Sequence, residues 1–365
     1  MLSSDAFHIA PLGPDLVAWA WQQWFMDNMN EFIVASRYGL ESGSVRELSR
    51  RYKKGELVRV RKGIYVDKQH WLGLKPWDRY AATARAVAAE NPSAAFCFET
   101  AALFWGLHIV GVPSHIHLAT ASRGHCGTRS PSTTAAVGPS GSTGLERIRT
   151  YGTYRHYYPT STVSLRGLQV TDLPQTTVNV LARGPFTKGV VLADHAISAK
   201  RFPTLATSKD ALARAAESLA SKAKRQRVNA IIGFADINSG SAGESLSRAQ
   251  MHLLGFPLPE LQCEFHDALG FVARTDFFWR DQGIIGEFDG DAKYLKDEYL
   301  RGQSAREAVL AEKKREDRLR AMGFRVVRWD WATANDPAKL GAKLLAAGLR
   351  PQNTPKRTIH PRVRG

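Results

Sequence analysis

Apolar residues near the N-terminal end of the chain recur with helical spacing and then switch to strict alternation. The helical spacing predicts helices over residues 28–39, 43–53 and 77–90. Between the last two helices, residues 57–66 alternate apolar and basic side chains, which predicts a β-hairpin that turns at residues 62–63. Helix, helix and hairpin in this order predict a winged-helix domain.

The C-terminal third of the chain has the clearest pattern of apolar positions. It predicts a helix, three strands, a long helix, a fourth strand and a last helix. In order, these elements cover residues 242–254, 260–267, 271–279, 283–289, 299–322, 324–331 and 336–347. Up to the fourth strand, the predicted order is therefore α-β-β-β-α-β.

The middle of the chain, residues 91–237, mixes short apolar runs with turn residues. Residues 94–108 are predicted to be helical, and residues 115–120 read as a strand. Residues 121–150 are rich in Gly, Ser, Thr, Pro and Arg and predict a long exposed loop. The basic segment 205–228 is either a helix that faces solvent or a linker.

A chain of 365 residues exceeds what one hydrophobic core usually serves, so several domains are expected. The fold class we predict is α+β and multidomain, with a winged helix, a mixed α/β middle domain and a C-terminal α-β-β-β-α-β domain. The expected boundaries are an N-terminal extension at 1–25, the winged helix at 26–90, the middle domain with a basic linker at 91–237, the C-terminal domain at 238–349 and a basic tail at 350–365.

The formal net charge of +16 is unevenly distributed. Residues 26–90 carry 13 basic and 8 acidic side chains, and residues 91–237 carry 16 and 7, whereas residues 238–331 carry 14 and 16. A positive field attracts polyanions, so double-stranded DNA is the expected partner, although a solubility effect explains the charge equally well. No apolar stretch is long enough to span a bilayer, and no cysteine lies in a CxxC pair, which fits a cytoplasmic protein with no membrane partner.

Four carboxylates stand out in the C-terminal domain. Glu244 lies on the first helix, Asp276 on the second strand, and Glu287 and Asp289 share one face of the third strand. Carboxylates crowded among apolar residues persist where a cation neutralises them, and hard oxygen ligands suit Mg²⁺ or Mn²⁺. We therefore expect all four carboxylates to belong to the catalytic site, with Asp276, Glu287 and Asp289 binding the metal and Lys293 assisting catalysis. The alternative is that these are ordinary acids that face solvent at strand ends.

Basic side chains also gather on the second helix and the hairpin of the N-terminal domain. A helix suits the major groove of DNA, and a basic hairpin can lie along the adjacent backbone. The alternative is a generic charged helix followed by an edge hairpin that basic residues protect from aggregation. The residues expected to contact DNA are Arg46, Arg50, Arg51, Lys53, Arg59, Arg61 and Lys62.

An ordered set of motifs in residues 241–331 resembles the PD-(D/E)xK nuclease superfamily, in particular the very-short-patch-repair-like endonucleases. The matching positions are Glu244, Asp276, Glu287-Phe288-Asp289-Gly290, Glu316-Asp317-Arg318-Leu319 and Val326-Val327-Arg328-Trp329. The resemblance implies a metal-dependent hydrolysis of phosphodiester bonds. Asp289 stands where the family pattern has a lysine, and Lys293-Tyr294 replace a frequent histidine, so a domain that has lost catalysis remains the alternative.

Short motifs further upstream resemble the antitoxins of the AbiEi type. In the wing these are Gly55, Leu57, Arg59, Val60, Arg61, Gly63 and Tyr65, and in the middle domain Ala101-Ala102, Gly106-Leu107, Ile116-His117-Leu118, Pro174 and Thr176-Thr177-Val178. This resemblance implies a transcriptional autorepressor with a cognate toxin as a partner. The sequence thus predicts a DNA-binding protein with a Mg²⁺-dependent endonuclease domain in toxin–antitoxin or phage-defence function, or else a repressor whose nuclease fold is inactive.

Overall fold

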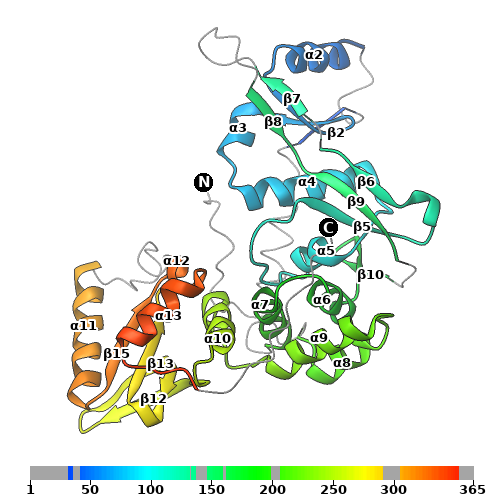
Figure 1. Ribbon diagram of the computed structural model, residues 1–365. Coiled ribbons are helices and arrows are strands. Elements are labelled where there is room, and N and C mark those ends of the chain that lie inside the picture. The colour runs from blue at the N-terminus through cyan, green and yellow to red at the C-terminus, as the bar shows by residue number, and fades with distance from the viewer. Residues whose placement is uncertain are drawn as a thin grey trace. The chain divides into compact units, whose positions relative to one another are not determined.

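The computed structural model describes residues 32–35, 42–131, 133–136, 146–158, 162–198, 206–290 and 305–352. The chain is a mixed α/β protein with several sheets and divides into two compact units (Figure 1). The first unit comprises residues 1–183 and 198–229, and the second comprises residues 184–197 and 230–365. Among the described residues, no helix is long and apolar enough to cross a membrane.

The N-terminal part of the first unit is a small sheet covered by helices. The sheet has the order β1-β3-β2, with strands β1 (Ile33–Val34), β2 (Leu57–Arg61) and β3 (Ile64–Asp67). The helices are α2 (Ser42–Lys53), α3 (Lys68–Gly73) and α4 (Pro76–Glu90). The hairpin and the helices predicted at 43–53 and 77–90 are confirmed, and Gly63 turns the hairpin with a φ of 72°.

The helix predicted at 28–39 is wrong for the residues that the structure describes there. Ile33 and Val34 form a short strand that pairs with Tyr65 and Ile64 of β3. This pairing completes the small sheet, whose buried side chains Val58, Val60, Ile64 and Val66 share one core with Trp71 of α3. Long-range hydrogen bonding in the sheet has therefore outweighed the local helical spacing.

The rest of the first unit is built around a six-stranded sheet with the order β10-β11-β4-β5-β9-β6. The strands are β4 (Ala95–Phe96), β5 (His115–Thr120), β6 (Gly127–Arg129), β9 (Gly152–Tyr157), β10 (Thr162–Leu165) and β11 (Leu168–Thr171). A separate hairpin joins β7 (Thr133–Ala136) to β8 (Glu146–Arg149), and the helices are α5 (Phe98–Phe104), α6 (Leu173–Leu181) and α8 (Lys209–Ala216).

Two expectations for this region need correction. The helix expected over 94–108 begins only at Phe98, because Ala95 and Phe96 pair with β5 and β11. The loop expected over 121–150 contains β6, β7 and β8, which hydrogen bonds to neighbouring strands hold in place. The strand expected at 115–120 is confirmed as β5.

A pair of histidines lies on neighbouring strands of the six-stranded sheet. His117 Nδ1 and His156 Nε2 are hydrogen-bonded at 2.8 Å, and His117 Nε2 lies 3.4 Å from Glu99 Oε2. Burial, followed by the charges of His156 and Arg183, lowers the pKa of His117 to about 3. Burial, with the charge of Arg183, lowers the pKa of His156 to about 4. Both rings are therefore neutral near pH 7; His117 is buried and His156 is half-buried.

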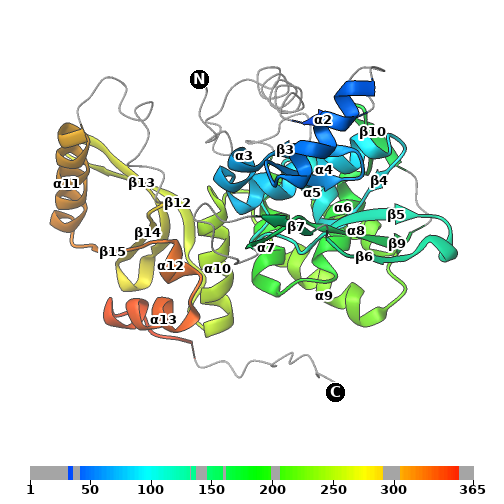
Figure 2. The same ribbon diagram turned by 90° about the horizontal axis from the view of Figure 1, so that it is seen from above.

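The second unit places one sheet between two layers of helices (Figures 1 and 2). Its sheet has the order β12-β13-β14-β15, with β12 (Glu260–Asp267), β13 (Gly270–Trp279), β14 (Ile284–Phe288) and β15 (Arg325–Trp329). Its helices are α7 (Phe186–Ile197), α10 (Ala242–Leu254), α11 (Ala305–Ala321), α12 (Trp331–Ala334) and α13 (Pro337–Ala346), while α9 (Lys222–Phe234) has residues in both units.

The predicted order α-β-β-β-α-β is confirmed for α10 to β15, with β12, β13 and β14 antiparallel and β15 parallel to β14. On one face, Trp329 Nε1 donates to Ser247 Oγ of α10 at 2.8 Å. A Cβ at Gly243 would lie 2.0 Å from the Phe288 ring, so only glycine lets α10 approach the sheet so closely. On the other face, Ile285 packs in one core with Leu319 of α11.

A buried ion pair joins α7 to α10 in the second unit. Arg248 Nη2 donates to both oxygens of Asp194 at 2.9 Å, and Arg248 Nη1 donates to the carbonyl of Phe234 at 2.8 Å. Asp194 is 1% exposed and Arg248 is 5% exposed. Arg248 therefore serves the packing of this unit through Asp194 and Phe234.

Candidate active site and nucleic-acid interface

Strand pairing brings Asp276 and Glu287 face to face. In the antiparallel pair of β13 and β14, Phe277 lies opposite Gly286, so the same register continued by one step places Asp276 opposite Glu287. The Phe288 N–H donates to Asp276 Oδ2 at 2.8 Å, which fixes the carboxylate at the end of the pairing. Two acids that are 11 positions apart in the sequence thus share one edge of the sheet.

Glu244 joins this pair through a residue that sequence reasoning missed. Gln262 Nε2 donates to Glu244 Oε2 at 2.9 Å and lies 3.5 Å from Asp276 Oδ1. Glu244 Oε2 also accepts the Gly240 N–H at 2.6 Å. Gln262 has a φ of 53°, a left-handed conformation that costs a non-glycine residue on the order of 1–3 kcal/mol and is concentrated at functional sites. No periodicity in the sequence signals such a residue.

Glu287 is held by an arginine that the sequence analysis did not single out. Arg315 of α11 donates to Glu287 Oε1 at 3.2 Å and to Oε2 at 3.0 Å. Burial raises the pKa of Glu287, and hydrogen bonding and the charge of Arg315 oppose this shift. The nearby charge of Asp276 raises the same pKa further, which agrees with the opposed positions of the two acids.

Asp289 lies beside a different guanidinium group. Arg328 Nη1 approaches Asp289 Oδ1 at 3.3 Å, and Arg328 Nη2 lies 4.0 Å from Glu287 Oε2. Arg328 also pairs with Glu312 and Glu316 of α11. Asp289, expected from the sequence to bind metal, is thus engaged with Arg328, and Lys293 lies outside the described residues.

The chemistry of this cluster suits a hard divalent cation. Its ligand atoms would be carboxylate oxygens, and its acids outnumber its guanidinium groups. The acids are Glu244, Asp276, Glu287, Asp289, Glu312 and Glu316, against Arg315, Arg320 and Arg328. Within the described ranges, however, no three His, Cys, Asp or Glu side chains are arranged to hold an ion together. Asp276 and Glu287 are the pair whose chemistry fits, and a cation held there would have to displace Arg315 from Glu287.

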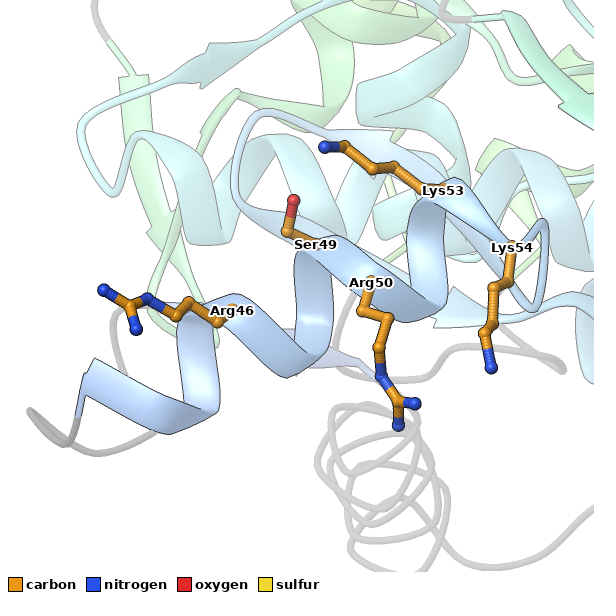
Figure 3. A pocket seen from close by; sticks show the side chains of 5 residues that line it. All are labelled: Arg46, Ser49, Arg50, Lys53 and Lys54. Carbon is orange, nitrogen blue, oxygen red and sulfur yellow. The ribbon is translucent and has the colours of Figure 1, made fainter.

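The basic helix of the first unit presents several of the expected DNA-contacting residues to solvent. Arg46, Arg50 and Lys53 are exposed on α2, and with Ser49 and Lys54 they line one shallow hollow (Figure 3). Arg50 is paired with Glu47 on the same helix, Nη2 to Oε1 at 2.6 Å. An exposed array of long cationic side chains suits contact with phosphate groups.

The remaining residues expected to contact DNA divide into two groups. Lys62 and Arg59 are exposed on the hairpin, and the Arg59 guanidinium lies 5.5 Å from the centre of the Tyr52 ring of α2. Arg51 is half-buried and pairs with Glu56 at 3.2 Å.

Arg61 departs from the expectation that it contacts DNA. It is 7% exposed, and its Nε donates to Glu90 Oε2 at 2.7 Å. This ion pair links the hairpin to α4, so Arg61 is not available to bind DNA. The strand alternation did not reveal this burial, because β2 is buried at Val60 and Arg61 in succession, next to a register shift in its pairing with β3.

No protein-family profile matches the chain. Two uncharacterized proteins of Mycobacterium tuberculosis, from strains CDC 1551 and H37Rv, are each 38% identical in an alignment of 73 residues that covers 18% of this chain. The chain spans 27% of the length of these relatives. The crystal structure of the Rv2827c protein of Mycobacterium tuberculosis aligns with 71% of this chain and 93% of its own, at 13% identity and a TM-score of 0.32, which supports no inference about a shared fold.

Proposed function

We propose that this protein binds double-stranded DNA through its first unit and hydrolyses phosphodiester bonds in its second unit with Mg²⁺ or Mn²⁺. In such a protein the N-terminal region is a winged helix, the middle region is AbiEi-like and the second unit is a restriction-endonuclease-like domain. The observation that carries it is the meeting of Asp276 with Glu287 across β13 and β14, with Gln262 joining Asp276 to Glu244.

Each of these residues has a role in the proposed reaction. Asp276 and Glu287 would hold the ion, which supplies an activated water and screens charge on the phosphodiester. Gln262 fixes the carboxylates of Glu244 and Asp276 relative to each other. Once exchanged from Glu287, Arg315 is positioned to bind a phosphate oxygen, in place of the lysine that the family pattern has at Asp289.

A cleavage assay tests the proposal directly. Supercoiled, linear duplex and single-stranded DNA are incubated with the purified chain and Mg²⁺ or Mn²⁺. Asp276→Asn should reduce cleavage by at least about 100-fold, the loss typical of removing one electrostatic group from a catalytic site. Asp281→Asn, which changes an exposed acid in the same unit, is the matched control and should leave the rate unchanged. Wild-type protein that leaves all three DNA forms intact with both metals overturns the nuclease.

One observation favours a second candidate, a cytoplasmic antitoxin-like repressor with an inactive nuclease fold and a cognate toxin. The bidentate pairing of Glu287 with Arg315 neutralises the buried carboxylate without a metal ion. A repressor should shift DNA from its own upstream region in the presence of EDTA and should cut none of it. A toxin-like gene beside its own would support this candidate.

A further inference from the structure

The first unit carries a second cationic surface, away from α2 and the hairpin. Arg129 on the edge strand β6 and Arg155 on the adjacent β9 are both exposed. Arg123, in the short turn before β6, is exposed as well. Residues 100–171 contain six arginines and a single acid, Glu146, so almost nothing in this stretch of the sequence offsets their charge.

Strand register places these side chains on one face of the sheet. Arg129 pairs with Thr153 and Gly127 pairs with Arg155, so Arg129 and Arg155 are diagonal neighbours on that face. Tyr157 lies two residues beyond Arg155 and therefore points to the same side. Two guanidinium groups and an aromatic ring thus project together from an edge of the sheet.

An aromatic contact holds the third arginine in position. The guanidinium carbon of Arg123 lies 4.3 Å from the centre of the Tyr157 ring, and Tyr157 is 42% exposed. Such a cation–π contact restricts the long arginine side chain, so less conformational entropy is lost when the guanidinium binds an anion. Protection of an edge strand requires charge but does not require this preorganisation.

The cationic surface is connected to the proposed DNA-reading region through the β7–β8 hairpin. Strand β7 contacts β2, and β8 ends at Arg149, three positions before β9 begins at Gly152. We propose that Arg123, Arg129 and Arg155 bind the phosphate backbone of duplex DNA that extends beyond the site of α2 and the hairpin. This inference rests on the proposed DNA binding of the first unit, but it does not depend on the nuclease.

The test compares two duplex lengths and measures the salt dependence of binding by the full chain. One duplex spans about one helical turn (about 10 bp) and the other about three turns (about 30 bp). Each phosphate contact contributes about 0.9 to the slope of log K against log salt. Arg129→Gln/Arg155→Gln should therefore reduce this slope by about 1.8 on the long duplex and leave the slope on the short duplex unchanged.

The control variant Lys339→Gln/Lys343→Gln removes the same charge from exposed positions of α13 and should alter neither slope. An unchanged melting temperature of the Arg129→Gln/Arg155→Gln variant establishes that it is folded. An unaltered slope on the long duplex, as edge protection alone would give, overturns the inference. An equal reduction of the slope on both duplexes overturns it too. Wild-type protein that binds neither duplex overturns instead the DNA binding on which the inference rests.

Discussion

Replacing Asp194 with alanine should destabilise the second unit by about 3–5 kcal/mol, the usual cost of leaving one partner of a buried ion pair uncompensated. Arg248 is 5% exposed, and the variant would remove both of its hydrogen bonds to Asp194 Oδ1 and Oδ2. The Asp236 N–H, which donates to Asp194 Oδ1 at 2.8 Å, would lose its acceptor as well. A positive charge would then remain inside the unit, with the carbonyl and the aromatic ring of Phe234 beside it.

The complementary variants separate loss of charge from loss of packing. Arg248→Met should cost less than Asp194→Ala at low pH, because burial already raises the pKa of Asp194 and the lone carboxyl can be neutralised by protonation. The double variant Asp194→Leu/Arg248→Met should be more stable than Asp194→Ala, since apolar replacement of both partners leaves no buried charge.

Urea unfolding measures these differences. A loss of 3–5 kcal/mol lowers the midpoint by about 2 M for a domain of ordinary size. Hydrogen exchange of peptides from α7 and α10 assigns the loss to the second unit. Asp281→Ala, at an exposed position of the same unit, is the control and should change the midpoint little. A loss below about 1 kcal/mol for Asp194→Ala, or a double variant as unstable as the two single losses combined, would falsify the reasoning.

Two further predictions concern the first unit. Because the folded-state pKa values of His117 and His156 are lowered to about 3 and about 4, the stability from their neutral burial is present above the unfolded pKa of about 6.5 and is lost as pH falls from there toward 4. Thermal melts between pH 7 and 4 should fall less steeply for His156→Gln, and equal slopes would contradict this. Arg61→Gln should lower the melting temperature because it breaks the ion pair with Glu90. Arg50→Gln, at an exposed position, should weaken DNA binding and leave the melting temperature unchanged. The opposite pattern in thermal melts and gel shifts would reverse the two assignments.

The elements of the second unit could be predicted from the sequence because their signals are local. The apolar spacing that predicted a helix at 242–254 and a strand at 260–267 comes from side chains within each element, and α10 and β12 have those bounds. On β14, side chains alternate with a period of two, which places Glu287 on one face of the strand. Antiparallel pairing with β13 then brings Asp276 opposite Glu287.

Contacts between distant segments decided the features that the sequence did not predict. Ile33 lies in a strand because it pairs with Tyr65 of β3. Arg61 is buried because it forms an ion pair with Glu90 of α4. Arg315 reached Glu287 from 28 positions away along the chain, and Gln262 took a left-handed conformation between two carboxylates. Periodicity reports which face of an element is apolar. The partner of a charged side chain depends on how the elements pack, which is a property of the whole fold.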